Sequence, residues 1–302
     1  MVNTLVASMT NGILIIDKPA GLTSHDVVHR VRRIVGQRDV GHLGTLDPMA
    51  TGVLPLVLGN MTRLAQFYLK SEKSYEGVIR FGFATDTYDA EGEPIGEARP
   101  FSCSIDEVRE LSRKFCGSIE QTPPPFSAKK IEGVPAYKLA RKKKEVALKP
   151  VQVEVKEFEI LDLNGADASF RAKVSSGTYV RSIAHELGQL AGCGAHLSSL
   201  RRTVVAEFTM EDARTLDQLQ RGMQDAGLDS MLVHPRKLLP ALPSVMATDE
   251  IAGRIRHGRP VNLPEFSRAR EVKVFYGQRD LIAIATRVAG TLFHPGLVFT
   301  PR

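Results

Sequence analysis

The chain has 302 residues, of which 43% are hydrophobic and 25% are charged, and its formal net charge is +6. This composition is typical of a folded globular protein, and the length suits one large domain or two. No apolar run approaches the roughly 20 residues of a membrane span, the N-terminus has no secretion signal, and the three cysteines form neither a CxxC pair nor a zinc spacing, so we expect a cytoplasmic protein with reduced thiols and no membrane partner.

The N-terminal part alternates apolar strands with capped helices. Residues 12–16 form an apolar run that predicts a strand. Thr23 and Asp26 have the form of a helix capping box, and apolar positions recur at helical spacing from there until Gly36, so a helix is predicted between them. We then expect a strand at 53–58, a helix at 60–69, a strand at 74–83 with Tyr75 in its core-facing row, and a helix at 104–116.

The C-terminal part begins with a run of three prolines at 123–125, which predicts a loop or a sheet edge because proline cannot donate a ladder hydrogen bond. We expect a helix at 136–144, strands at 151–161 and 168–174, a helix at 182–190 and a strand at 197–208. Prolines between 232 and 248 predict a boundary, followed by a small β-rich module with a hairpin around 277–280. Strands outnumber helices in mixed order, which favours an α+β fold with a mixed, largely antiparallel central sheet and flanking helices.

The net positive charge comes from one segment. Between 128 and 149 there are eight basic and two acidic residues, whereas the rest of the chain has 32 of each. A basic patch on a neutral body indicates a polyanion partner such as RNA or DNA, although a solvated charge run or a flexible arm has the same composition. The basic residues of this segment are Lys129, Lys130, Lys138, Arg141, Lys142, Lys143, Lys144 and Lys149.

Residues 41–59 read GHLGTLDPMATGVLPLVLG, and Asp47 is the only formally charged residue among them. Pro48 biases Asp47 toward an extended backbone, so the loop can present one carboxylate beside a buried strand. Asp-Pro and glycine are also ordinary turn chemistry, so spacing alone favours a structural turn. However, a lone carboxylate in an apolar setting is costly unless it is paired or used.

The whole string resembles the pattern G-H-x-G-T-L-D-P-x-A-x-G-x-L of the TruB family, the bacterial tRNA pseudouridine-55 synthases. Further blocks resemble the same family in order: IIDKPAGLTSHDVV, KSYEGVIRFGFATDTYDAEGE, TPPPFSAKKIEGVPAYKLAR, SSGTYVRSIAHELG and CGAHLSSLRRT. The resemblance implies a pseudouridine-synthase catalytic domain at 1–235, with an RNA-clamp insertion at about 123–150, and a PUA-like RNA-binding module at 245–302. The sequence departs from the family at 142–144, where three lysines stand in place of the usual glycine.

The reaction implied by the resemblance is isomerisation of a uridine in the tRNA T-loop, at position 55, to pseudouridine. Asp47 is expected to be the catalytic nucleophile or base, Arg181 its ion-pair partner, and Tyr75 the ring that stacks on the base. The chemistry needs no cofactor and no metal, and the sequence contains no phosphate-binding or dinucleotide-binding glycine motif and no metal-ligand spacing.

The same resemblance implies a set of substrate-binding residues. His42 is expected to fill the space left by a flipped base, a step that costs a few kcal/mol, although lone histidines are often packing residues. Tyr179 and Leu200 are expected to line the pocket, although simple packing explains Tyr179 nearly as well. The set is completed by Lys18, Arg202 and the clamp residues Lys129, Lys130, Arg141, Lys142 and Lys143. The expected partner is tRNA, contacted at the T-arm and the acceptor stem by a monomer.

Three other functions compete with this one. Residues 40–44 resemble the GXXG loop of a KH module, which binds RNA without catalysis, but Pro48 interrupts the helix that should follow. A guide-RNA-dependent synthase would share the catalytic core and differ in substrate. A nucleic-acid glycosylase would use Asp47 to cleave rather than isomerise, and would release free uracil.

Overall fold

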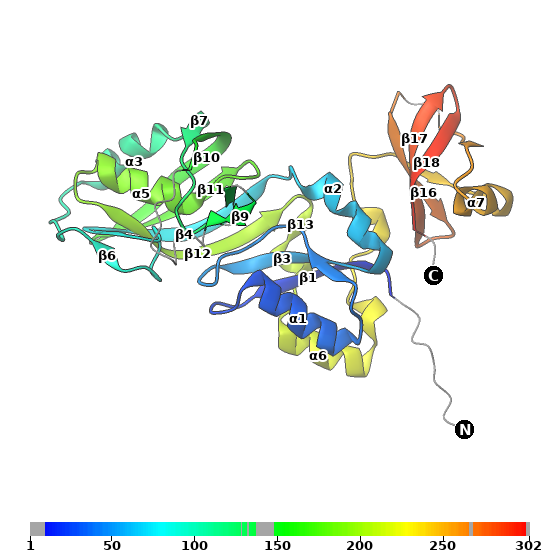
Figure 1. Ribbon diagram of the computed structural model, residues 1–302, viewed down its shortest axis with the longest axis horizontal. Helices are drawn as coiled ribbons and strands as arrows, with labels where there is room; N and C mark the ends of the chain where they lie inside the picture. Colours follow the sequence, from blue (N-terminus) through cyan, green and yellow to red (C-terminus); the bar gives the residue numbers. More distant parts are fainter. Residues whose placement is uncertain (1–9, 128, 132, 137–147, 266–267, 300–302) are drawn as a thin grey trace.

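The computed structural model describes residues 10–127, 129–131, 133–136, 148–265 and 268–299 (Figure 1). Its centre is a nine-stranded sheet whose main path runs β1-β3-β12-β4-β11-β10-β7, with β2 paired to β3 and β13 paired to β12. These strands are β1 (Gly12–Lys18), β2 (Val40–His42), β3 (Thr51–Leu58), β4 (Lys73–Phe81), β7 (Gly117–Gln121), β10 (Val151–Asn164), β11 (Asp167–Val174), β12 (Ala195–Val205) and β13 (Phe208–Thr209). The expected α+β class with a largely antiparallel sheet is confirmed, since β3 and β12 are the parallel pair of this sheet.

The parallel contact between β3 and β12 needs a glycine. Gly52 pairs with Arg202 and has a φ of +102°. A Cβ added there would lie 2.2 Å from the carbonyl oxygen of Arg202, so an L-residue would clash with the neighbouring strand. Gly52 therefore lets the end of the Asp47 loop pack directly against β12.

The helices form where local signals place them. In α1 (Ser24–Val35), Thr23 and Asp26 form both hydrogen bonds of the capping box, and Gly36 ends the helix with a left-handed φ of 68°. The helix buries Val27 and Val31 and lies beside α6 (Leu216–Asp225), next to β1 and β3 (Figure 1). At the other end of the sheet lie α3 (Ile105–Arg113), with the expected cap at Ser104, and α5 (Val180–Leu190).

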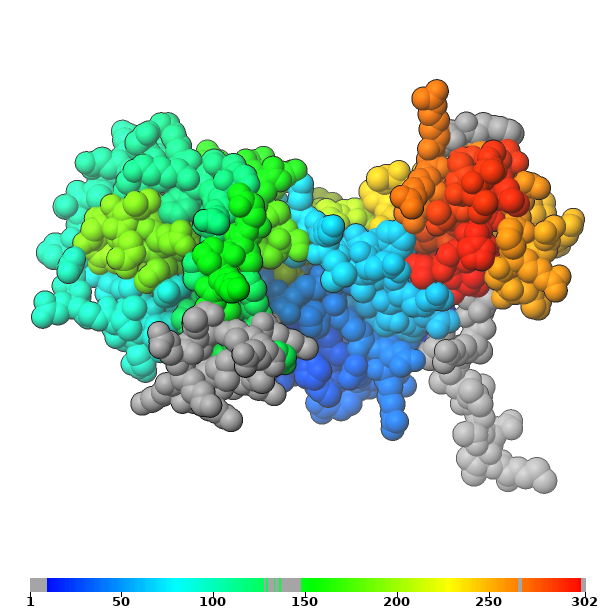
Figure 2. Space-filling view, turned by 45° about the horizontal axis from the view of Figure 1, so that its top comes forward, coloured from blue at the N-terminus to red at the C-terminus, as the bar shows by residue number. Residues whose placement is uncertain are grey.

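The chain after residue 243 forms a separate five-stranded sheet with the order β14-β16-β17-β18-β15. Its elements are β14 (Ser244–Met246), α7 (Asp249–Arg256), β15 (Val261–Asn262), β16 (Glu271–Tyr276), β17 (Asp280–Ala289) and β18 (Leu292–Val298). Figure 2 shows this C-terminal module, in orange and red, at the opposite end of the molecule from the teal and green segments. Phe275, Leu281 and Ile284 share one apolar cluster with Ile13 and Ile15, so the module packs directly against the large sheet.

The structure also corrects details. The helix expected at 60–69 is a 3₁₀ segment, η1 (Gly59–Leu64), followed by one short turn, α2 (Ala65–Tyr68). Helix α6 was not predicted, because Leu219 is its only fully buried residue, yet its capping box Thr215–Gln218 was readable in the sequence. The helix expected at 136–144 lies outside the described residues.

The other short elements are β5 (Ala84–Thr85), β6 (Pro94–Ile95), β8 (Lys130–Ile131), β9 (Val134–Pro135), η2 (Met210–Asp212), η3 (Leu228–Ser230) and η4 (Pro235–Lys237). Across the described residues, every helix is too short or too polar to traverse a bilayer.

Candidate active site

A cavity of about 310 Å³ opens where the Asp47 loop meets the start of β4 and the start of α5. This is within the size range of small-ligand sites, at the lower end. Six of the residues predicted from sequence line it together: His42, Asp47, Tyr75, Tyr179, Arg181 and Leu200. They come from four separate parts of the chain, and the fold brings them to one place.

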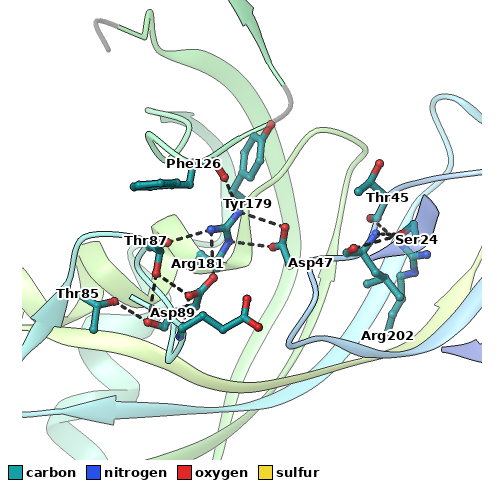
Figure 3. A network of polar contacts seen from close by, with 12 residues as sticks. Ser24, Thr45, Asp47, Thr85, Thr87, Asp89, Phe126, Tyr179, Arg181 and Arg202 are labelled. Carbon is teal, nitrogen blue, oxygen red and sulfur yellow. Dashed lines mark hydrogen bonds and ion pairs between the residues drawn. The ribbon is translucent and has the colours of Figure 1, made fainter. Parts of the chain in front are cut away.

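Asp47 and Arg181 form the charged centre of this cavity (Figure 3). Arg181 Nε lies 2.9 Å from Asp47 Oδ2, and Nη2 donates to Asp47 Oδ1 at 3.2 Å, so the guanidinium holds both carboxylate oxygens. Arg181 itself is 4% exposed, while 35% of the Asp47 side chain remains accessible. One face of the carboxylate is therefore fixed by the arginine, and another is open to a ligand.

Arg181 also holds a second carboxylate, which the sequence analysis missed. Its Nη1 donates to Asp89 Oδ2 at 3.1 Å and to the carbonyl oxygen of Thr87 at 2.9 Å. Asp89 is 2% exposed, and its Oδ1 accepts from the Thr87 hydroxyl at 2.6 Å and from the amide of Glu91 at 3.1 Å. Asp89 thus fixes the far end of the guanidinium, so that Arg181 reaches Asp47 from a single direction.

The pKa of Asp47 is set by opposing effects. Burial raises the pKa of Asp47, and the Asp89 carboxylate adds to that increase, while the Arg181 and Lys18 cations lower the pKa. Because one guanidinium serves two carboxylates, the ionised group carries a net negative charge toward the cavity. Asp47 therefore depends on Arg181 to stay ionised in a partly desolvated place.

The backbone of the Asp47 loop is held from below by buried side chains. Lys18 Nζ donates to the carbonyl oxygens of Pro19, Leu22 and Pro48 at 2.9, 2.6 and 3.1 Å. The Ser24 hydroxyl accepts from the Leu46 amide at 2.8 Å and lies 3.1 Å from the Leu46 carbonyl oxygen, to which it donates. The residues of the KPAGLTS block thus support the loop that carries Asp47.

Arg202 also supports the backbone of this loop (Figure 3). Its guanidinium donates to the carbonyl oxygens of Val53, Thr45 and Gly44 at 2.8, 3.2 and 3.1 Å. Both Arg202 and Lys18 are 0% exposed. Because their donors already face backbone carbonyls inside the protein, these two predicted substrate-binding residues lie behind the loop, and their positions fit support of Asp47 better than direct contact with a substrate.

Tyr75 and His42 line the cavity, and both interact with Arg202. Burial raises the pKa of Tyr75, whose hydroxyl interacts with Arg202, so the phenol is neutral at ordinary pH. Burial also lowers the pKa of His42, with the charge of Arg202 adding to the effect, and its Nδ1 accepts from the Gly44 amide at 3.4 Å. Both rings are therefore uncharged surfaces that border the cavity.

Tyr179 begins the segment that carries Arg181. The buried side chain of Gln121 fixes the backbone of Tyr179 by two hydrogen bonds. Tyr179 N donates to Gln121 Oε1 at 2.7 Å, and Gln121 Nε2 donates to the Tyr179 carbonyl oxygen at 3.1 Å. The carbonyl oxygen of Phe126 accepts from Arg181 Nη2 at 3.1 Å. The loop after β7 therefore packs on the cavity and connects it to the basic segment. Neither Gln121 nor Phe126 was predicted as part of the site.

The clamp residues are only partly described. Lys129 is partly buried and Lys130 begins the short hairpin of β8 and β9, just after the loop at the cavity. Arg141, Lys142 and Lys143 lie outside the described residues. Their assignment to RNA binding stays a prediction.

Comparisons with known proteins agree with these motifs. Residues 32–180 match the model for the TruB family pseudouridylate synthase N-terminal domain, and residues 181–240 match that for the tRNA pseudouridylate synthase B C-terminal domain. A relative named tRNA pseudouridine synthase B from Solibacter usitatus is 48% identical over 291 residues, covering 95% of this chain and 99% of the relative. The protein of the same name from Aquifex aeolicus is 38% identical and covers 93% of this chain and 97% of its own length.

Solved structures give the same fold. A chain from the structure of an H/ACA RNP bound to a substrate RNA containing 2′-deoxyuridine superposes with a TM-score of 0.70 at 26% identity, covering 96% of this chain and 86% of the other. A chain from a Cbf5-Nop10-Gar1 complex gives 0.70 at 27% identity, with 96% and 85% coverage. Together with the two family models and the relatives that are similar over nearly their whole length, these findings show that the chain belongs to the TruB family of pseudouridylate synthases.

Proposed function

We propose that this protein isomerises a uridine in tRNA, at position 55 of the T-loop, to pseudouridine. The observation that carries the proposal is the Asp47 carboxylate, held on both oxygens by Arg181 at the wall of a 310 Å³ cavity. The relatives at 38–48% identity that bear the name tRNA pseudouridine synthase B support tRNA as the substrate.

In this reaction the bond between ribose C1′ and N1 breaks, the base rotates, and C1′ bonds to C5. The C5 proton is lost to solvent and N1 gains a proton from solvent, so the product is an isomer of the substrate and no oxidant, reductant or other co-reactant is consumed. Asp47 is the catalytic group, acting as nucleophile or base. An ordinary carboxylate is already ionised at neutral pH, so the protein contributes position and desolvation, with Arg181 and Asp89 as positioning residues.

The remaining cavity residues bind the flipped nucleotide. Tyr75 stacks on the uracil ring, and its hydroxyl takes part in the late removal of the C5 proton. His42 fills the space that the base leaves in the RNA stack, while Leu200 and Tyr179 close the apolar wall. Flipping costs a few kcal/mol, which these contacts offset.

The tRNA is held at two further places. The basic segment at 129–149 binds the T-arm, and the C-terminal module contacts the acceptor stem. Positive charge near phosphates supplies most of the sequence-independent affinity. The enzyme acts as a monomer in the cytoplasm, where its tRNA substrate is located.

Tritium release from an unmodified tRNA transcript labelled at C5 of uridine tests the proposal. In a buffer containing EDTA, we expect one tritium released per tRNA and a pseudouridine mapped to position 55. Release of free uracil would instead identify a glycosylase, and tight binding with no release would identify an RNA-binding protein without this chemistry.

A second candidate is a guide-RNA-dependent synthase, favoured by the similarity to chains from H/ACA complexes. The identity of 26–27% in that comparison is lower than the 48% shared with a tRNA pseudouridine synthase B. The two candidates differ in one requirement: a guide-dependent enzyme is inactive on a naked tRNA transcript when no guide RNA or partner protein is present.

A further inference from the structure

Lys73 lines the cavity and has no role in the function described so far. It is the first residue of β4 and precedes Tyr75 by two positions, so both side chains lie on the same face of the strand. Its aliphatic chain runs beside the Asp47 loop, because a Cβ added to Gly44 would lie 3.4 Å from Lys73 Cε. The ammonium group is therefore carried to the wall of the cavity next to the loop that presents Asp47.

The surroundings of this ammonium differ from those of the other cations nearby. Lys18 and Arg202 each donate to three backbone carbonyls, and Arg181 is paired with two carboxylates. Lys73 Nζ donates to the carbonyl oxygen of Ser71 at 2.9 Å, and among the described residues no carboxylate oxygen lies within 4.0 Å of it. An ammonium group has three donors, so the protein leaves capacity on Lys73 unused.

The charge of Lys73 is also unfavourable when the cavity is empty. Burial, together with the nearby positive charge of Arg202, lowers the pKa of Lys73 to about 8. A cation in such a place is stabilised by an anion that enters the cavity. Asp47 and Asp89 do not meet this need, because neither carboxylate lies within 4.0 Å of Lys73 Nζ and both pair with Arg181 instead. The anion that a flipped nucleotide carries with it is a phosphodiester.

We propose that Lys73 binds a phosphate that flanks the target uridine, and so sets how deep the ribose sits relative to Asp47. The contact is a charge-assisted hydrogen bond from Nζ to a non-bridging phosphate oxygen. This inference rests on the proposed function, since it requires a nucleotide in the cavity. It adds a substrate-binding residue to the lining of the cavity.

The test pairs a change in the protein with a change in the RNA. T-arm hairpins are prepared with one neutral methylphosphonate, either 5′ or 3′ of the target uridine. Their Kd and KM are measured with the wild type, Lys73→Met and Lys73→Arg. We expect Lys73→Met to weaken binding roughly tenfold to a hundredfold, and one of the two methylphosphonates to weaken binding to the wild type by the same factor. That methylphosphonate should have no effect on Lys73→Met, and Lys73→Arg should restore sensitivity to it.

Lys70→Met is the matched control, because Lys70 is exposed three residues away and does not line the cavity. It should keep the full methylphosphonate effect. The proposal is overturned if neither methylphosphonate raises the Kd of the hairpin for the wild type, which can be measured without any variant. It is also overturned if the methylphosphonate raises the Kd by the same factor in Lys73→Met as in the wild type. A purely structural Lys73 would give that second result together with a lower Tm.

Failure of the proposed function is a different outcome. If the wild type binds the hairpins but forms no pseudouridine in any of them, the reaction assignment is wrong. The Kd values still decide the role of Lys73 in that case, because binding of a flipped nucleotide and its phosphate is measured without turnover.

Discussion

The two sides of the Asp47 loop use buried cations in different ways. On the cavity side, Arg181 is satisfied by the carboxylates of Asp47 and Asp89. On the inner side, Lys18 and Arg202 are fully buried, and each donates to three backbone carbonyls. Both arrangements fix the loop, but in the first one a cation pairs directly with the catalytic carboxylate.

Cations on carbonyl oxygens and cations on carboxylates have different effects, the first on geometry and the second on reactivity. A cation on carbonyl oxygens fixes the path of the backbone, yet it keeps its desolvation cost because carbonyl dipoles compensate a buried charge less than a carboxylate does. A cation on carboxylates shifts their ionisation. Substitutions on the two sides should therefore be separable, with losses of activity on one side and losses of stability on the other.

The largest effect is expected from substitution of Asp47, the catalytic group on the loop that both sets of cations hold. Asp47→Asn keeps the shape of the side chain but removes its charge, so turnover in the tritium-release assay should vanish while tRNA binding persists. The loop should remain folded because its carbonyl contacts do not involve this side chain. Undiminished activity would return Asp47 to the role of a turn residue.

Next in size is the loss of the ion pair on the cavity side. Arg181→Met should lower kcat roughly a hundredfold to a thousandfold, since a preorganised electrostatic partner is removed. Arg181 lowers the pKa of Asp47, so without it that pKa rises, and the acid limb of the residual pH–rate profile should move to higher pH. An acid limb at the same pH as in the wild type would show that Arg181 affects only the geometry of the site and not the pKa of Asp47.

On the inner side of the loop, the main expected effect is a loss of stability. Arg202→Met leaves the carbonyls of Gly44, Thr45 and Val53 without their donor, which should lower the free energy of unfolding by roughly 3 kcal/mol. Denaturant titration measures this value. Arg201→Met is the control, because that side chain is 41% exposed and its pair with Asp17 should contribute only about 0–1 kcal/mol. Equal losses in the two variants would contradict the comparison.

The smallest effect is the pH dependence that arises from Lys18. Burial lowers the pKa of Lys18 from 10.5 to about 8, so the unfolded chain binds more protons than the folded one between these values. Stability should therefore rise with pH across this window, by about 1 kcal/mol between about pH 7 and pH 9 for this group. Lys18→Met should lack that increment relative to the wild type. Lys73 titrates in the same range but is present in both proteins, so the difference isolates Lys18.

The amino-acid sequence by itself determined the local elements and the chemical family. The capping boxes at Thr23 and Ser104 and the apolar run of β3 were readable because each depends on residues a few positions apart. The string around Asp47 pointed to the catalytic carboxylate for the same reason, since it is one continuous loop. Arg181 and Tyr75 were found through resemblance, and the structure brings both to the cavity.

Only the tertiary structure decided which charges meet. Asp89 lies in a loop far from both Asp47 and Arg181 in sequence, so no local pattern marks it as the second partner of the guanidinium. Lys18 and Arg202 read as cations for RNA in the sequence, but the fold places them behind the loop on its carbonyls. Lys73 is the opposite case, because no role was assigned to it from the sequence and the fold places it at the cavity. The physical reason is that ion pairing and desolvation depend on distance in space, which the packing of the sheet sets.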